Sequence, residues 1–184
     1  MKHLIELRRQ KDIFFAGDHQ SPLMPSQKQG FKGLSYFPEA PDLRFKLSIE
    51  RFTDQQTIEI QTSTGDFQQY QNFGKIRFPV DDEQVELTIY ANEHGFFLPF
   101  VDSLAGAETY PAGRYLEPEP LANGMFLIDF NQAYNPYCAY NEHWSCPLTP
   151  FENRLKVPIR AGEKIFQQQI SIWRYTDEQT YSYF

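Results

Sequence analysis

Residues 73–90 read FGKIRFPVDDEQVELTIY and contain two runs of alternating apolar and polar residues around the turn DDEQ. The apolar residues are Ile76 and Phe78 in the first run, and Val85, Leu87 and Ile89 in the second. A period of two places such side chains on one face of a β-strand. The stretch therefore predicts two neighbouring strands, each with one face toward a core.

The same pattern extends to both sides of this stretch. Alternation recurs in residues 45–52 and 58–61 before it, and in residues 96–101 after the turn NEHG. Five short strands with turns every eight to twelve residues predict a mainly β (α+β) protein, an antiparallel β-barrel or sandwich. GRYL, MFLIDF and EKIFQQQISIWRY are later strand candidates. An aromatic content of 16% also favours sheet-rich packing, because aromatic side chains suit pleated surfaces.

The N-terminal residues show a helical period instead. A helix with one apolar face is predicted over residues 2–16 from Leu4, Ile5, Leu7, Lys11, Phe14 and Phe15, and Gly17 with Asp18 ends it. We expect this helix to be the longest in the chain and to pack across one end or face of the sheets. The following SPLMPSQ, with two prolines and no periodic pattern, predicts a loop.

The length and charge of the chain indicate its domain organisation and limit its possible partners. The 184 residues suit one domain over residues 1–184: an N-terminal helix (2–16), antiparallel strands (42–103), and motif-rich loops with closing strands (104–184). The formal net charge of −7 and the lack of a dense basic cluster argue against nucleic acid as a partner. The start of the chain does not resemble a secretory signal, and no long apolar run predicts a membrane helix, so we expect a soluble, cytoplasmic protein. The oligomeric state stays unknown.

Residues 129–155, DFNQAYNPYCAYNEHWSCPLTPFENRL, hold both cysteines and many asparagines and prolines. Cys138, His143 and Cys146 form C-x4-H-x2-C, a possible metal set that would need a fourth ligand such as His94 or Asp102. Cys138 as a nucleophile with His143 as its base is a second possibility. We rank both below a structural role, because free cysteine is usually buried, and expect reduced cysteines with Cys138 mostly buried and metal-free.

A set of polar residues offers a second candidate site. We expect Arg114 and Asp129 to share one polar network at the mouth or floor of a pocket, because both flank apolar runs and a buried charge needs a partner. The network is either a structural salt bridge with asparagines that bind loop backbone, or a pocket that grips a carboxylate or phosphate. The candidate ligand-binding residues are Arg114, Asp129, Asn131, Tyr134, Asn135, Asn141, Asn153, Arg154 and Glu163.

Several motifs resemble one known family. TYPAGRYL (109–116), DFNQAYNPYCAYN (129–141), CPLTPFENRL (146–155) and AGEK (161–164) together resemble the bacterial and archaeal family called domain of unknown function 1684. SPL (21–23) and GLSYFP (33–38) are similar to its earlier motifs, so the resemblance covers nearly the whole chain. Thr149 departs from it, since the family often has proline there. The resemblance implies no activity, catalytic residue or cofactor.

Three function classes therefore stay open. The leading one is binding or conversion of a small polar or anionic metabolite in a pocket walled by the loops of residues 103–164. The second is a hydrolase or metal-dependent enzyme that uses Asp129, Cys138 and His143. The third is a structural or partner-binding module without chemistry. The cofactor is unknown.

Overall fold

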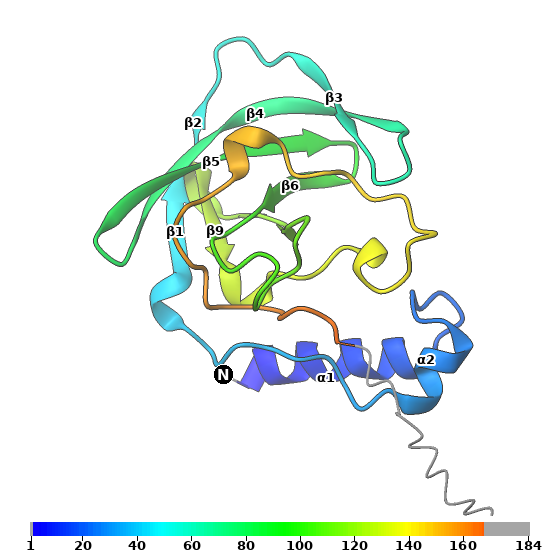
Figure 1. Ribbon diagram of the computed structural model, residues 1–184. Helices are drawn as coiled ribbons and strands as arrows, with labels where there is room; N and C mark the ends of the chain where they lie inside the picture. The colour runs from blue at the N-terminus through cyan, green and yellow to red at the C-terminus, as the bar shows by residue number, and fades with distance from the viewer. Residues whose placement is uncertain (1, 168–184) are drawn as a thin grey trace, which may run out of the picture.

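Two antiparallel sheets form the body of the protein, which a computed structural model describes over residues 2–167 (Figure 1). The larger sheet has the order β2-β4-β5-β6-β7 with β3 beside β4, and the smaller has the order β1-β9-β8. Over these residues the sheets do not close into a barrel, so the predicted β fold takes its sandwich form. The strands are β1 (Arg44–Ser48), β2 (Glu50–Arg51), β3 (Thr57–Gln61), β4 (Phe67–Val80), β5 (Glu83–Asn92), β6 (Gly95–Phe100), β7 (Arg114–Leu116), β8 (Glu119–Pro120) and β9 (Met125–Asp129).

The β4–β5 hairpin confirms the two strands predicted from residues 73–90. Ile76 lies opposite Leu87 in the register, and all but about 1% of each side chain is buried. The turn is tighter than predicted, because Glu83 already pairs with Val80. Asp81 allows this, since it adopts a φ of 50° and aspartate tolerates the left-handed region that two-residue hairpin turns need.

A glycine marks the corner where the chain passes from one sheet to the other. β1 ends at Ser48 in the small sheet, and β2 begins at Glu50 in the large one. Gly74 lies opposite Arg51 beside a β-bulge, and a Cβ there would meet the Glu50 carbonyl oxygen at 2.5 Å. Only glycine lets the two backbones approach this closely.

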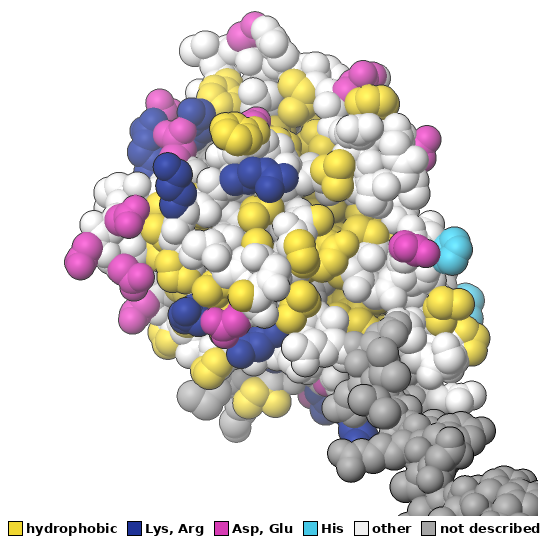
Figure 2. All heavy atoms as spheres, in the orientation of Figure 1, with side chains coloured by type: hydrophobic (Ala, Val, Ile, Leu, Met, Phe, Trp, Pro, Cys, Tyr) yellow, Lys and Arg dark blue, Asp and Glu magenta, His cyan; other side chains and the backbone are white. Residues whose placement is uncertain are grey.

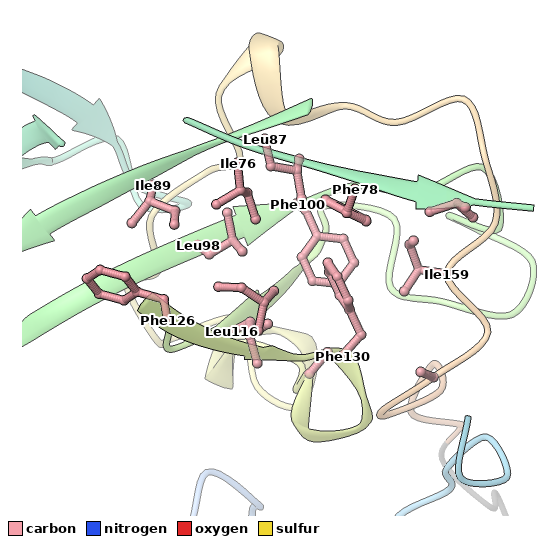
Figure 3. Close-up of a cluster of buried hydrophobic side chains, with 14 of the residues drawn as sticks. Ile76, Phe78, Leu87, Ile89, Leu98, Phe100, Leu116, Phe126, Phe130 and Ile159 are labelled. Carbon is pink, nitrogen blue, oxygen red and sulfur yellow. The ribbon is translucent and has the colours of Figure 1, made fainter. Parts of the chain in front are cut away.

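The core fills the space between the sheets (Figure 3). Phe100 and Phe130 meet edge to face with ring centroids 5.2 Å apart, and both are fully buried. Ile159 joins them from the segment after the last described strand and is also fully buried. The long loops are therefore part of the core rather than a covering over it.

Helix α1 (Lys2–Gly17) lies across one end of the sheets, as the sequence predicts (Figure 1). Leu4 and Phe15 face the body and are buried. The predicted loop SPLMPSQ is partly wrong, because helix α2 (Pro25–Gly30) begins inside it with proline in its first turn, where a missing amide proton costs nothing. Short 3-10 helices occur at η1 (Pro41–Leu43), η2 (Ala122–Gly124), η3 (Phe130–Gln132), η4 (Tyr137–Ala139) and η5 (Phe151–Asn153).

Within residues 2–167, α1 is the longest helix and strands cover more of the chain than helices, as expected. The last predicted strand, EKIFQQQISIWRY, is wrong at its start: Glu163 forms an isolated bridge with Tyr36, and residues 164–167 form no strand. The rest of that segment lies outside the described residues. No helix in the described part of the chain is long and apolar enough to cross a membrane.

Candidate functional site

Asp129 lies at the end of β9 and is held by its neighbours in the fold. Its Oδ1 accepts hydrogen bonds from the amide and the Nδ2 of Asn131 at 3.1 and 2.8 Å, and its Oδ2 accepts one from Arg44 Nε at 2.7 Å. Arg44 is opposite Asp129 in the β1–β9 register, so strand pairing brings the two together. Burial by itself would raise the pKa of Asp129, but the hydrogen bonds from Asn131, Arg44 and Gln132 lower it overall. Asp129 is therefore an ionised, fully engaged carboxylate.

The predicted pairing of Arg114 with Asp129 is wrong. Arg114 Nη2 instead lies 3.1 Å from Asp102 Oδ2, and each of the two side chains is only 1% exposed. The guanidinium also donates to the carbonyl oxygens of Ile159, Ala161 and Glu163. The predicted polar set did not include Asp102. Asp102 follows β6, which pairs with the Arg114 strand β7, whereas Asp129 ends β9 in the other sheet. Arg114 ties the segment 159–163 to the sheet.

Three of the predicted asparagines bind backbone groups. Asn131 accepts from the amide of Ala40 and donates to its carbonyl oxygen, at 2.7 and 2.9 Å. Asn153 bridges Thr88 in β5 and Pro99 in β6, and is fully buried. Asn135 donates to the carbonyl oxygen of Lys164. These contacts fit the structural alternative for Asn131 and Asn153, because an amide side chain satisfies the buried backbone of loops.

Glu163 connects the loops to helix α1. Its side chain is 1% exposed, and its Oε2 accepts from the amide of Asn135 and from the hydroxyl of Tyr140. Its Oε1 lies 3.1 Å from Lys11 Nζ of α1. Gly162 precedes it with a φ of 75°, and a Cβ there would meet the carbonyl oxygen of Ala133 at 2.5 Å. The glycine thus allows the close contact that places Glu163 under the helix.

A cavity of about 290 Å³ lies between α1 and the 131–134 segment, and we call it the α1 cavity. Its walls combine apolar and aromatic side chains with a small number of polar ones. It is lined by Leu4, Leu7, Arg8, Lys11, Tyr36, Asn131, Gln132, Ala133 and Tyr134. The predicted residues Asn131 and Tyr134 therefore line this cavity, whereas Arg114, Asp129 and Asn153 do not.

Two polar atoms in residues of the cavity wall, one in Arg8 and one in Tyr36, have no hydrogen-bond partner among residues 2–167. The guanidinium of Arg8 lies 4.4 Å from the centroid of the Tyr36 ring and donates to the carbonyl oxygens of Phe37 and Asn131. Its buried Nε and the buried hydroxyl of Tyr36 have no hydrogen-bond partner among residues 2–167. Burial lowers the pKa of Arg8 and raises that of Tyr36. Buried polar atoms are usually paired, so these two atoms are exceptions to the usual pattern.

Sequence reasoning missed Arg8 and Tyr36. The available sequence signal was the presence of two cations on an otherwise apolar helix face. That face is defined by the spacing of Leu4, Arg8, Lys11 and Phe15. Such a face buries cations only if the surface opposite offers partners. That surface is built from Tyr36 and Phe37, and from a segment that begins 123 positions after Arg8, and one-dimensional periodicity does not identify it.

The Cys–His arrangement differs from both of its predicted forms. His143 is exposed, and its Nδ1 lies 2.8 Å from Asn141 Oδ1, its closest polar contact. No group of three His, Cys, Asp or Glu side chains in the described part of the chain could hold a metal ion, so Cys138, His143 and Cys146 do not assemble one. Cys138 is half-buried rather than mostly buried, and Cys146 is the buried thiol.

The other predicted residues lie away from the α1 cavity. Asn141 caps the turn at His143, and Arg154 is exposed, with its guanidinium donating to the carbonyl oxygen of Thr149 at 3.5 Å. A second cavity of about 310 Å³ lies between α2 and residues 164–167, and Asn135 lines it. Its wall includes Gln167, the last described residue.

Comparisons with known proteins agree with the fold. An uncharacterised protein of Haloarcula marismortui, solved by solution NMR, is 35% identical, with a TM-score of 0.68 over 89% of this chain and 92% of that one. No protein with a curated description matches the chain. The family profile "Protein of unknown function (DUF1684)" matches residues 29–164, which include every motif from Gly33 to Lys164. Since that match spans well over half of its length, the chain belongs to the DUF1684 family.

Proposed function

We propose that the protein binds a small carboxylate with an apolar or aromatic body in the α1 cavity. One observation carries this proposal: Arg8 Nε and the Tyr36 hydroxyl are buried in the cavity wall without partners. Both are donors, and a carboxylate is an acceptor with two oxygens. A hydrogen bond between a guanidinium and a carboxylate is among the stronger ones in proteins.

The charges around the cavity leave Arg8 as the cation that is available to a ligand. Lys11 is already paired with Glu163 across the helix contact. Within residues 2–167, Arg8 has no ion pair and donates only to backbone carbonyl oxygens. The charges of Glu39, Asp129 and Glu163 favour the charged form of Arg8, and a ligand carboxylate would add a direct ion pair to this half-buried guanidinium.

The remaining wall favours an apolar or aromatic body. Leu4 and Leu7 contribute aliphatic surface from α1, and Tyr36 and Tyr134 contribute aromatic side chains. A volume of about 290 Å³ is at the lower limit of typical ligand pockets, which begin at about 300 Å³. The cavity therefore suits a metabolite of low molecular mass rather than a nucleotide or a chain.

We further propose that the protein acts in the cytoplasm and that neither nucleic acid nor a membrane is its partner. On the face that Figure 2 shows, Lys and Arg side chains lie among Asp and Glu side chains rather than forming a broad basic surface. The formal net charge of −7 also disfavours a polyanion, which would need several phosphate contacts. Binding without catalysis is preferred because the candidate carboxylates Asp129 and Glu163 are both engaged.

Thermal-shift screening with paired probes tests this function. The probes are benzoate, phenylacetate and hexanoate, each compared with the corresponding neutral amide. We expect at least one carboxylate to raise the melting temperature more than its amide does. Arg8→Gln should weaken that binding by about tenfold or more, since hydrogen bonds to charged groups are worth about 1.5–3 kcal/mol.

The matched control is Arg9→Gln, which removes a cation from the exposed face of the same helix, where among residues 2–167 the Arg9 side chain pairs only with Glu6. This variant should bind the probe like the unmodified protein. Tyr36→Phe, which keeps the ring and removes the hydroxyl, should give an intermediate loss. Equal binding by the Arg8→Gln and Arg9→Gln variants, or no response to any carboxylate, would refute the proposal.

A further inference from the structure

The two cysteines, eight positions apart in sequence, come together in the fold at a site separate from the α1 cavity. The backbone amide of Cys138 donates to Cys146 Sγ at 3.3 Å. Since an N–Cα bond adds about 1.5 Å, that sulfur lies at most about 4.8 Å from the Cα of Cys138. Cys146 Sγ therefore lies next to Cys138, as a disulfide between the two side chains requires.

Both cysteines are positioned by fixed backbone. Cys138 is the second residue of η4, and the hydroxyl of Tyr110 lies 3.8 Å from its sulfur. The amide of Cys146 donates to the Ser63 hydroxyl, and its carbonyl oxygen accepts from the Ser63 amide. The loop end that carries Cys146 is therefore anchored to the residues that follow β3. The pair does not depend on a flexible approach of two loops.

The two thiols differ in access and in acidity. Cys138 is half-buried and reachable, whereas Cys146 is only 7% exposed. Hydrogen bonding from the Cys146 thiol, helped by the hydroxyls of Tyr110 and Ser63, lowers the pKa of Cys138 despite its partial burial. The same contact, together with burial, raises the pKa of Cys146. The reachable sulfur is thus the one that more readily becomes a thiolate, which is the reactive form.

We propose that Cys138 and Cys146 form a hydroperoxide-sensitive dithiol site, with Cys138 as the attacking thiol and Cys146 as the resolving thiol. The Cys138 thiolate attacks a peroxide oxygen, the O–O bond breaks, and Cys138 becomes a sulfenic acid while the leaving oxygen takes a proton to form water or an alcohol. The Cys146 thiol then loses its proton and attacks that sulfur, and the S–O bond breaks with release of water. Two thiols lose two electrons, the hydroperoxide gains them, and one disulfide results.

Peroxide treatment of the full chain, followed by alkylation in denaturant and intact mass analysis, tests the site. We expect both thiols to disappear together, giving a monomer lighter by two hydrogen atoms that dithiothreitol restores. In Cys146→Ser, oxidation should stop at a Cys138 sulfenic acid that dimedone traps. In Cys138→Ser, the buried Cys146 should keep its thiol at the same peroxide dose.

Circular dichroism of each variant checks that it is folded, and Cys146→Ala replaces Cys146→Ser if the serine variant is not. Three results would overturn the proposal. One is that both thiols of the native protein stay open to alkylation after peroxide. Another is that the disulfide forms only between two chains. The third is that dimedone labels Cys146 in Cys138→Ser as readily as it labels Cys138 in the reciprocal variant.

Discussion

Lys11 Nζ in helix α1 lies 3.1 Å from Glu163 Oε1, across 152 positions of sequence. The carboxylate is 1% exposed and also accepts hydrogen bonds from Asn135 and Tyr140. This ion pair joins the N-terminal helix to the last motif of the family, and its Lys11 member lines the α1 cavity. Its removal should therefore affect both stability and the position of the helix.

Lys11→Met should lower the free energy of unfolding by about 1–3 kcal/mol, because it leaves a buried carboxylate oxygen without its cation. Arg9→Met on the exposed face of α1 is the matched control and should leave the melting temperature close to that of the unmodified protein, since exposed pairs contribute little. Urea denaturation followed by circular dichroism measures both. Similar losses of unfolding free energy in the two variants would show that the buried pair contributes no more to stability than the exposed one.

Arg114 and Asp102 should be energetically coupled. Removing either side chain leaves the other charge buried, so Arg114→Met and Asp102→Asn should each cost about 3–5 kcal/mol. The double variant should lose clearly less than the sum, because the two act on one interaction. Arg114→Met combined with Asp129→Asn should be close to additive, since these residues share no partner. A larger coupling with Asp129 than with Asp102 would contradict the observed pairing.

Gly162→Ala should destabilise the protein more than Gly124→Ala. Both glycines have a φ near 75°, so the backbone strain of about 1–2 kcal/mol is common to the two variants. A Cβ at Gly124 meets nothing within 4 Å, whereas one at Gly162 meets Ala133 and Phe130 backbone oxygens at 2.5 and 2.7 Å. The difference between their free energies of unfolding measures the contact alone. No difference would mean that the 133–162 contact relaxes without cost.

Asp129 should make stability depend on acid pH. Its folded pKa is lower than its unfolded value of about 3.9, so its contribution is fully present above the unfolded pKa. That contribution is lost as pH falls through the lower folded pKa, when the carboxyl takes up a proton and loses its ion pair with Arg44. Asp129→Asn should therefore lower stability at neutral pH and flatten its fall in acid.

Denaturation curves between pH 7 and about pH 3 measure this effect. Asp82→Asn, in the exposed turn between β4 and β5, is the control and should keep the acid dependence of the unmodified protein. If Asp129→Asn retains the same slope as well, other carboxyl groups account for the acid sensitivity.

The sequence by itself determined the elements of this protein. The alternation in residues 73–90 and the helical spacing in residues 2–16 correspond to β4, β5 and α1, because local periodicity decides which face of an element is apolar. The family motifs likewise identified the segments that form the loops around Asp129 and Glu163. The turn at Asp81 and the start of α2 were placed less well, since turn and cap chemistry shifts element ends by a few residues.

Only the tertiary structure decided which charges meet. The sequence predicted Asp129 as the partner of Arg114, but strand order gives Arg114 the Asp102 side chain after β6, while the β1–β9 register gives Asp129 to Arg44. The α1 cavity likewise combines helix residues with a loop more than 100 positions later. The sequence indicates that a buried charge needs a partner. Which residue becomes that partner depends on long-range packing, and the spacing of residues in the sequence does not reveal it.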